Sequence, residues 1–298
     1  MKIKHLLCFI ALCLFFTPGK AQQLSVMTLR NGATVYIWED KSKPDVFGMI
    51  AFKVGSVDDP EQYTGLAHYL EHVMFKGTQT IDALDWEKEK PIYEKIIAKY
   101  DERAALSDPA AREAIDKEIN DLTREAAQYA AGNEFSLLVD HMGGQGLNAS
   151  TGYDQTEYHN SFPPSQLEKW LEIYSERLID PVFRGFQTEL EAVYEEYNMY
   201  NDDRGSRMRE FIYEQAFGDH PYARPIIGLP EHLKNPQLSK LIDFYNTWYG
   251  PQNMSIILVG NIDAKEAIPM IRDKFERVPR RAEIHREKKP VRQFKGRT

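Results

Sequence analysis

His68-Tyr69-Leu70-Glu71-His72 is the most informative segment of this 298-residue chain. Two histidines four residues apart lie on one face of an α-helix, one turn from each other, so both can reach the same metal ion. Glu71 lies in the same turn, where its carboxylate can reach a water molecule beside that ion. The pattern H-x-x-E-H therefore indicates a zinc site in which His68 and His72 are ligands and Glu71 transfers protons.

A third ligand must come from elsewhere in the chain, because a catalytic zinc usually has three protein ligands and one open position. The acidic segment 189–200 is the best source, since Glu189 and Glu196 are seven residues apart and share one helix face. They lie about 10.5 Å apart along the helix axis, so both cannot bind one zinc ion. One is expected to be a ligand and the other to contact a ligand.

The expected secondary structure mixes strands and helices without strict alternation, which indicates an α+β fold. Thr64 is predicted to cap the helix that carries the two histidines. Capping boxes at Ser165-x-x-Glu168 and Thr188-x-x-Glu191 predict two further helix starts. Strands are expected at 25–29, 33–38, 46–54, 147–151 and 255–259, and further helices at 238–245 and 264–275.

Residues 85–131 differ from their surroundings, being rich in lysine, glutamate and alanine with no strand signal. Asp108-Pro109 is typical of a helix start with proline at the first position. Ile115 and Ile119 then follow at helical spacing. We therefore expect an antiparallel helical hairpin over this segment.

The first 21 residues have the features of a secretory signal peptide. A basic start precedes an apolar run of 11 residues at 6–16, and small residues follow at Gly19 and Ala21. The run is shorter than the roughly 20 residues that span a bilayer, so no integral membrane anchor is expected. Cleavage after Ala21 would export the chain, to the periplasm or outside the cell. A buried N-terminal helix is the alternative.

Removal of this segment changes the composition. Both cysteines, Cys8 and Cys13, lie within it, so the mature chain has neither a disulfide nor a thiolate site. Cleavage also removes three of the 37 basic residues and none of the 45 acidic ones, so the net charge becomes −11. Such an acidic balance argues against nucleic acid and anionic membranes as partners.

Several spaced segments together resemble the pitrilysin (insulinase) family of zinc metallopeptidases, which includes the mitochondrial processing peptidases. The matching segments are 29–32, 65–78, 143–149, 195–200, 220–228 and 253–260. The resemblance extends from about residue 25 to about residue 280 and thus covers nearly the whole mature chain.

The resemblance implies roles for individual residues. It makes Glu196 the third zinc ligand and gives Glu189 a supporting catalytic role, with Glu195 as the alternative ligand. It also implies that the substrate lies against a strand edge at Asn148 and Ala149, for which an ordinary strand is the alternative.

The implied fold is a two-layer α+β sandwich, a largely antiparallel sheet with helices on one face. Residues 22–280 form the catalytic domain, 85–131 are a hairpin insertion, and 281–298 are a linker. Family members are normally built from two homologous halves, and this chain ends where the second half should begin. The expected partner is therefore a homologous C-terminal half, in cis on a longer chain or in trans as a subunit.

The expected function is that of a Zn²⁺-dependent metalloendopeptidase. It would hydrolyse peptides or small unfolded proteins bound as an edge strand. A non-catalytic scaffold subunit of the same fold, paired with an active partner, is the first alternative. A small lyase with the same motif is the second, which the signal peptide and the 195–200 segment disfavour.

Overall fold

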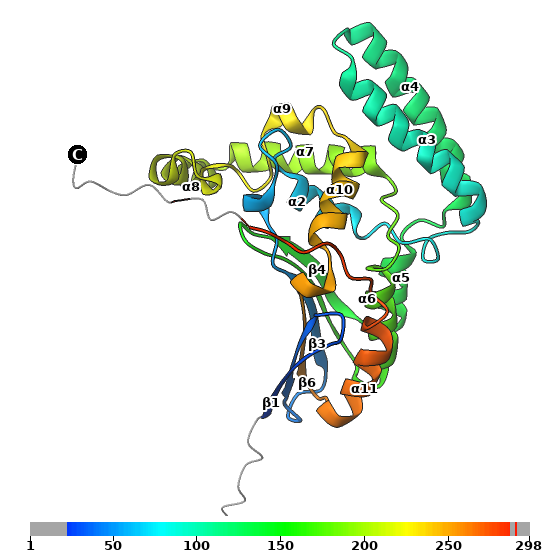
Figure 1. Ribbon diagram of the computed structural model, residues 1–298, viewed down its shortest axis with the longest axis vertical. Helices are drawn as coiled ribbons and strands as arrows, with labels where there is room; N and C mark the ends of the chain where they lie inside the picture. The colour runs from blue at the N-terminus through cyan, green and yellow to red at the C-terminus, as the bar shows by residue number, and fades with distance from the viewer. Residues whose placement is uncertain (1–22, 287–289, 291–298) are drawn as a thin grey trace, which may run out of the picture.

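The computed structural model describes residues 23–286 and residue 290, and a six-stranded sheet forms the centre of this part of the chain (Figure 1). The strand order is β1-β2-β6-β3-β5-β4. The parallel pair is β2 with β6, and the other neighbouring pairs are antiparallel. The strands are β1 (Gln23–Thr28), β2 (Thr34–Glu39), β3 (Val46–Phe52), β4 (Gln145–Thr151), β5 (Thr156–Phe162) and β6 (Met254–Gly260).

The helices, in chain order, are α2 (Leu66–Val73), α3 (Trp86–Ala105), α4 (Pro109–Ala126), α5 (Glu134–His141), α6 (Leu167–Glu176), α7 (Phe186–Asp202), α8 (Arg204–Phe217), α9 (Pro230–Leu233), α10 (Leu238–Trp248) and α11 (Ala264–Phe275). The predicted α+β fold with a largely antiparallel sheet is confirmed.

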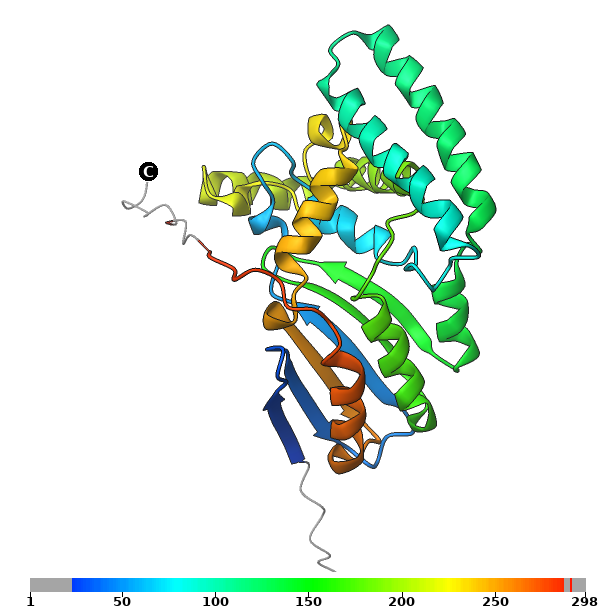
Figure 2. The same cartoon turned by 45° about the vertical axis from the view of Figure 1, so that its right-hand side comes forward.

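One face of the sheet is buried under helices. Accordingly, β3, β5 and β6 alternate buried and half-buried residues along their length. Helices α6 and α11 lie across this face (Figure 2). Trp170 of α6 stacks on Phe162 of β5 with ring centroids 5.2 Å apart. The indole approaches Gly48 so closely that a Cβ there would lie 2.5 Å from it, so the helix packs only over a glycine. The opposite face is less covered, and Trp38 is 37% exposed there.

Helix α2 carries the H-x-x-E-H segment, and the prediction that Thr64 caps it is wrong. Gly65 occupies the N-cap position with φ of +89° and has no side chain to cap the helix. Asp59 does so from the preceding 3-10 turn: its carboxylate accepts the backbone N–H groups of Gly65 at 2.7 Å and of Ala67 at 2.9 Å. A carboxylate six residues before Gly65 therefore replaces the expected cap from Thr64.

Both capping-box predictions are also wrong. Ser165 lies inside a 3-10 turn at Pro164–Gln166, and α6 begins only at residue 167. Helix α7 begins at Phe186, ahead of Thr188, because Gly185 adopts the left-handed conformation that allows the earlier start. Phe186 then packs against Tyr100 of the α3 helix. Helices α5 and α8 and strand β5 had no signal in the sequence.

Helices α3 and α4 form the predicted antiparallel hairpin, which projects from the rest of the molecule (Figure 1). Asp108 caps α4 by accepting the N–H of Ala111 at 3.1 Å. The hairpin is not independent at its root, however. Ile92, Ile96 and Tyr100 are buried in the main hydrophobic core, with Tyr100 edge-on to Phe186 of α7 at 4.8 Å.

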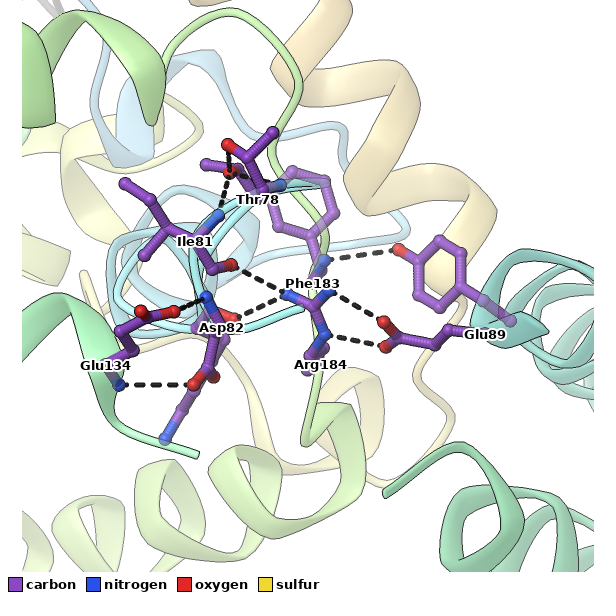
Figure 3. A network of polar contacts seen from close by, with 10 residues as sticks. Thr78, Ile81, Asp82, Glu89, Glu134, Phe183 and Arg184 are labelled. Atoms are coloured by element: carbon purple, nitrogen blue, oxygen red, sulfur yellow. Dashed lines mark hydrogen bonds and ion pairs between the residues drawn. The ribbon is translucent and has the colours of Figure 1, made fainter. Parts of the chain in front are cut away.

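A buried polar network fastens this root to the body (Figure 3). Arg184, just before α7, donates to both carboxylate oxygens of Glu89 on α3, at 2.6 and 2.8 Å. The Glu89 side chain is 2% exposed. Arg184 also donates to the carbonyl oxygen of Lys76 at 3.2 Å, in the segment that follows α2. The hairpin, the end of α2 and the start of α7 therefore meet at one ion pair.

The predicted signal peptide, residues 1–21, lies outside the described residues. Within the described ranges, none of the helices has the length and apolar character needed to cross a membrane. Residues 281–286 of the predicted linker contain neither helix nor strand.

Candidate metal centre and peptide-binding edge

Two histidines from α2 and one carboxylate from α7 converge at the packed interface of these helices. Nε2 of His68 lies 3.6 Å from Oε2 of Glu196, and Nε2 of His72 lies 3.5 Å from the same oxygen. One ligand atom from each residue lies within 4.8 Å of the other two. Two ligands of a tetrahedral zinc with bonds of about 2.1 Å are roughly 3.4 Å apart, and the two His–Glu distances are close to this spacing.

The protonation of His68 also suits a metal ligand. The residue is 8% exposed, and burial, reinforced by the charge of neighbouring His72, lowers its pKa to about 4. The imidazole is therefore neutral at physiological pH, the form that donates a lone pair to a metal. Two imidazoles and a carboxylate are a donor set that zinc commonly accepts.

Glu189 lies one heptad before Glu196 and contacts His72 of the candidate metal cluster without belonging to that cluster. Its Oε2 is 3.5 Å from Nδ1 of His72, and its Oε1 is 2.5 Å from Nζ of Lys76. Burial acts to lower the pKa of His72, but Glu189 and Glu196 outweigh it and raise that pKa to about 9. The geometry thus gives His72 one acidic neighbour at each ring nitrogen.

Glu195, the alternative ligand, lies away from the histidines. It is exposed and lines a separate groove of about 290 Å³ with Leu190 and Arg103. The cluster able to hold a metal among the described residues contains Glu196 and not Glu195.

Glu71 lies beside the metal-binding side chains without belonging to them. It is 9% exposed, and its Oε2 accepts a hydrogen bond from Oγ1 of Thr151 at 3.0 Å. Burial raises the pKa of its carboxyl above the ordinary value. A carboxylate whose pKa moves toward neutrality is suited to taking and giving a proton.

These groups open into one cavity of about 620 Å³ at the edge of the sheet. Its walls include the three candidate ligands, Glu71, the strand segment 148–151, Tyr153, and the α8 residues Arg209, Glu210 and Tyr213. Strand β4 is the last strand of the sheet and pairs only with β5 among the described strands, so its outer edge is free. Asn148 and Ala149 therefore lie on a free edge next to the metal-binding side chains.

Three contributors to the site were not predicted from the sequence. Lys76 follows His72 by four residues, a spacing that points to the same side of the chain. Thr151 follows Ala149 by two, and strand alternation puts both on one face. Helix α8 gave no signal, because its most apolar side chains, such as Phe211, are exposed rather than arranged as a core stripe.

Two protein-family models match segments of this chain. The family model described as Insulinase (Peptidase family M16) matches residues 34–90 and 122–229. The model for the Peptidase M16 inactive domain matches residues 237–298. The unmatched stretch between residues 90 and 122 falls within the helical hairpin.

Curated relatives include proteins named zinc proteases. The chain is 25% identical over 270 residues to the Probable zinc protease PqqL of Escherichia coli, covering 87% of this chain and 23% of that protein. It is 24% identical over 254 residues to the Zinc protease PqqE of Helicobacter pylori, covering 84% and 46%. The chain thus spans less than half the length of these two relatives.

Solved structures show the same fold. The first half of the periplasmic protease PqqL from Escherichia coli superposes with a TM-score of 0.68 at 24% identity, covering 91% of this chain and 50% of that one. Pitrilysin superposes with a TM-score of 0.67 at 22% identity, covering 92% of this chain and 25% of that one.

Proposed function

This chain belongs to the insulinase family of peptidases, family M16, and on that premise we propose that it is a zinc-dependent metalloendopeptidase. The observation that carries the proposal is the convergence of His68, His72 and Glu196 beside Glu71, in one cavity at a free strand edge. The names of the curated relatives support zinc as the metal.

The chemistry follows from the positions of these groups. Zinc bound there supplies Lewis acidity, which polarises a peptide carbonyl and lowers the pKa of a water molecule to about 7. Glu71 takes the proton of the attacking water and passes it to the amine nitrogen as the peptide C–N bond breaks. Glu189 holds His72 through Nδ1, which leaves Nε2 for the metal.

The substrate is a peptide or small unfolded protein that adds to the outer edge of β4 near Asn148 and Ala149. An extended chain can pair with the free backbone groups of an edge strand, as in other complexes formed by strand addition. Backbone pairing depends only weakly on the side chains of the bound peptide, so the sequence preference of cleavage is loose.

A homologous second half, in cis or in trans, completes the enzyme. This is supported by the share of each relative that the chain spans, 23% of PqqL and 46% of PqqE. It is also supported by exposed apolar side chains, among them Met208, Phe211 and Ile212 on α8 beside the cavity. Export to the periplasm or beyond is the proposed location, which agrees with the periplasmic location of the Escherichia coli relative PqqL.

The test uses residues 22–298 and fluorescein-labelled casein as an unfolded probe. We expect one zinc per chain by elemental analysis, slow casein cleavage by the chain alone, and a large gain when the homologous second half is added. Without that half the substrate is not clamped and water is not excluded, which weakens proximity and electrostatic effects. Glu71→Gln should keep its zinc and lose about 10²- to 10⁴-fold in rate.

Other outcomes have distinct meanings. A chain that binds zinc but leaves casein intact, even with the second half present, is the scaffold subunit and not the peptidase. Full activity of a monomeric 22–298 chain contradicts the need for a second half. Cleavage by Glu71→Gln at the wild-type rate removes Glu71 from the proton transfer.

A further inference from the structure

We propose that Thr151 is a positioning residue that links the peptide-binding edge of β4 to the carboxylate of Glu71. The inference rests on the proposed function of the site and adds to it a residue that controls how the base is held. Thr151 belongs to the strand on which the substrate lies, and its hydroxyl contacts the group that transfers the proton.

The first step of the argument is the contact itself. Oγ1 of Thr151 donates to Oε2 of Glu71 at 3.0 Å. Within the described part of the chain, Oε1 of Glu71 accepts no hydrogen bond. The carboxylate is thus held by one oxygen, which leaves the other to receive a proton in the cavity that Glu71 lines. A hydrogen bond to a charged acceptor restricts the rotation of the carboxylate and keeps it in one orientation.

The second step is the anchoring of Thr151 on the side of β4 that pairs with β5. It pairs with Thr156 of β5, whose Oγ1 donates to the carbonyl oxygen of Val54 at 2.9 Å. In the turn that follows, the carbonyl oxygen of Gly152 accepts the N–H of Ser56 at 3.1 Å. A Cβ on Gly55 would lie 2.4 Å from this oxygen, so the two backbones meet at a distance that only glycine permits. The turn is therefore fixed to the body of the protein.

The third step is the outer side, where β4 is free. Pairing of β4 with β5 is regular from Asn148 to Thr151, and the register shifts before Asn148. A peptide added along the outer edge would pair with this regular stretch, which ends at Thr151, and so hold the strand from its second side. Occupation of the edge is thereby transmitted through Thr151 to Glu71, so binding energy from residues remote from the cleaved bond improves the chemical step.

The first experiment needs no catalysis. Urea unfolding of the zinc-free chain is measured for Thr151→Val, Glu71→Ala and the double variant. If the two side chains interact, the shift in midpoint of the double variant is smaller than the sum of the two single shifts. Additive shifts overturn the proposed contact. This readout stands even if the chain cleaves nothing, so failure of the proposed function and failure of this inference are distinguishable.

The second experiment separates positioning from a structural role. Thr151→Val should keep one zinc per chain and an unchanged KM for casein, while kcat falls about tenfold to a hundredfold, the size expected for one lost hydrogen bond to a charged group. Thr151→Ser should restore kcat, since it keeps the hydroxyl. The matched control is Thr80→Val, which removes a Thr–Glu hydrogen bond of 2.9 Å to Glu176 on the surface. Loss of zinc, a raised KM with normal kcat, or no rescue by serine overturns the assignment.

The third experiment tests the link to the strand edge. Two fluorogenic peptides share one cleavage site taken from the casein digest, with about six and about twelve residues, so that only the longer one follows β4 along its length. In the wild type the longer peptide should have the higher kcat, because the added contacts hold Glu71 through Thr151. In Thr151→Val the longer peptide should lower KM alone. An equal gain in kcat in both proteins overturns the coupling.

Discussion

Lys76 and His72 share one carboxylate, because Glu189 lies 2.5 Å from Nζ of Lys76 through one oxygen and 3.5 Å from Nδ1 of His72 through the other. The ion pair fixes the carboxylate, and the carboxylate in turn fixes the orientation and tautomer of the imidazole. His72 then presents Nε2 toward Glu196 and the metal position. The candidate ligand His72 is thus oriented by a residue from α7 and by a lysine beyond the end of its own helix.

The role of Glu189 can be measured through zinc affinity. We expect Glu189→Ala to weaken zinc binding by about 10- to 100-fold, the usual effect of removing a carboxylate that orients a ligand histidine. Competition with a chromophoric chelator measures the change. Glu191→Ala is the matched control, an exposed glutamate on the same helix. Equal zinc affinity of Glu189→Ala and the wild type would show that the contact to His72 does not support the metal.

The three candidate ligands are expected to act as a set. The His68→Ala/His72→Ala double variant should bind no zinc, and Glu196→Gln should bind much less, because a catalytic zinc needs all three protein donors. Elemental analysis of the purified chain gives the stoichiometry. His141→Ala, which removes an exposed histidine distant in sequence from the motif, should keep its zinc. Full zinc content in the double variant would move the metal site elsewhere.

Much of this arrangement could be predicted from the sequence because local patterns carry it. The spacing of His68, Glu71 and His72 places them on one side of a helix. Glu189 and Glu196 are seven residues apart, so only one of them is expected to bind the ion. The strands expected at 25–29 and 33–38 correspond to β1 and β2, which pair antiparallel. These features depend on contacts within a few residues, so the sequence reveals them without the fold.

The parts that could not be predicted depend on long-range contacts. Thr64 does not cap α2, because its hydroxyl oxygen accepts the N–H of Leu229, 165 residues further along the chain. Asp59, six residues before Gly65, supplies the acceptor instead. β5 was missed because polar residues interrupt the apolar ones on its buried face: Asn160 is 0% exposed and accepts hydrogen bonds from Trp170 and Tyr174. A buried asparagine with partners from α6 cannot be distinguished from a loop asparagine until the helix is placed.

The Asp59 cap predicts a dependence of stability on pH. Burial raises the pKa of Asp59 from its ordinary value of 3.8 to about 7, although the N–H groups of Ala67 and Gly65 oppose this. The folded chain therefore holds a proton that the unfolded chain releases at lower pH. The stability linked to this proton is complete below about pH 4 and is lost as the pH rises through about 7.

Urea unfolding of the zinc-free chain between about pH 5 and about pH 8 should show this loss, and Asp59→Asn should reduce the slope because its amide does not titrate. Asp140→Asn, at an exposed site, is the control and should keep the slope of the wild type. An unchanged slope in Asp59→Asn would mean that Asp59 stays ionised in the folded chain over this range.

The last prediction concerns the root of the helical hairpin. Glu89 is the carboxylate partner of the Arg184 guanidinium, and both side chains are at least nine-tenths buried. Glu89→Ala leaves a buried positive charge without its partner, which typically costs about 3–5 kcal/mol of folding free energy. Urea unfolding measures this cost, and Glu87→Ala, a more accessible glutamate on the same helix, should be close to neutral. Replacing the distal segment 104–114 with a short Gly/Ser linker should retain zinc, because that segment lies beyond the ion pair and beyond the contacts of Asp101 with Ser239 and of Arg103 with Asn235. A distal replacement that loses its metal, or a Glu89→Ala variant as stable as the wild type, would show that the tip and not the root joins the hairpin to the catalytic body.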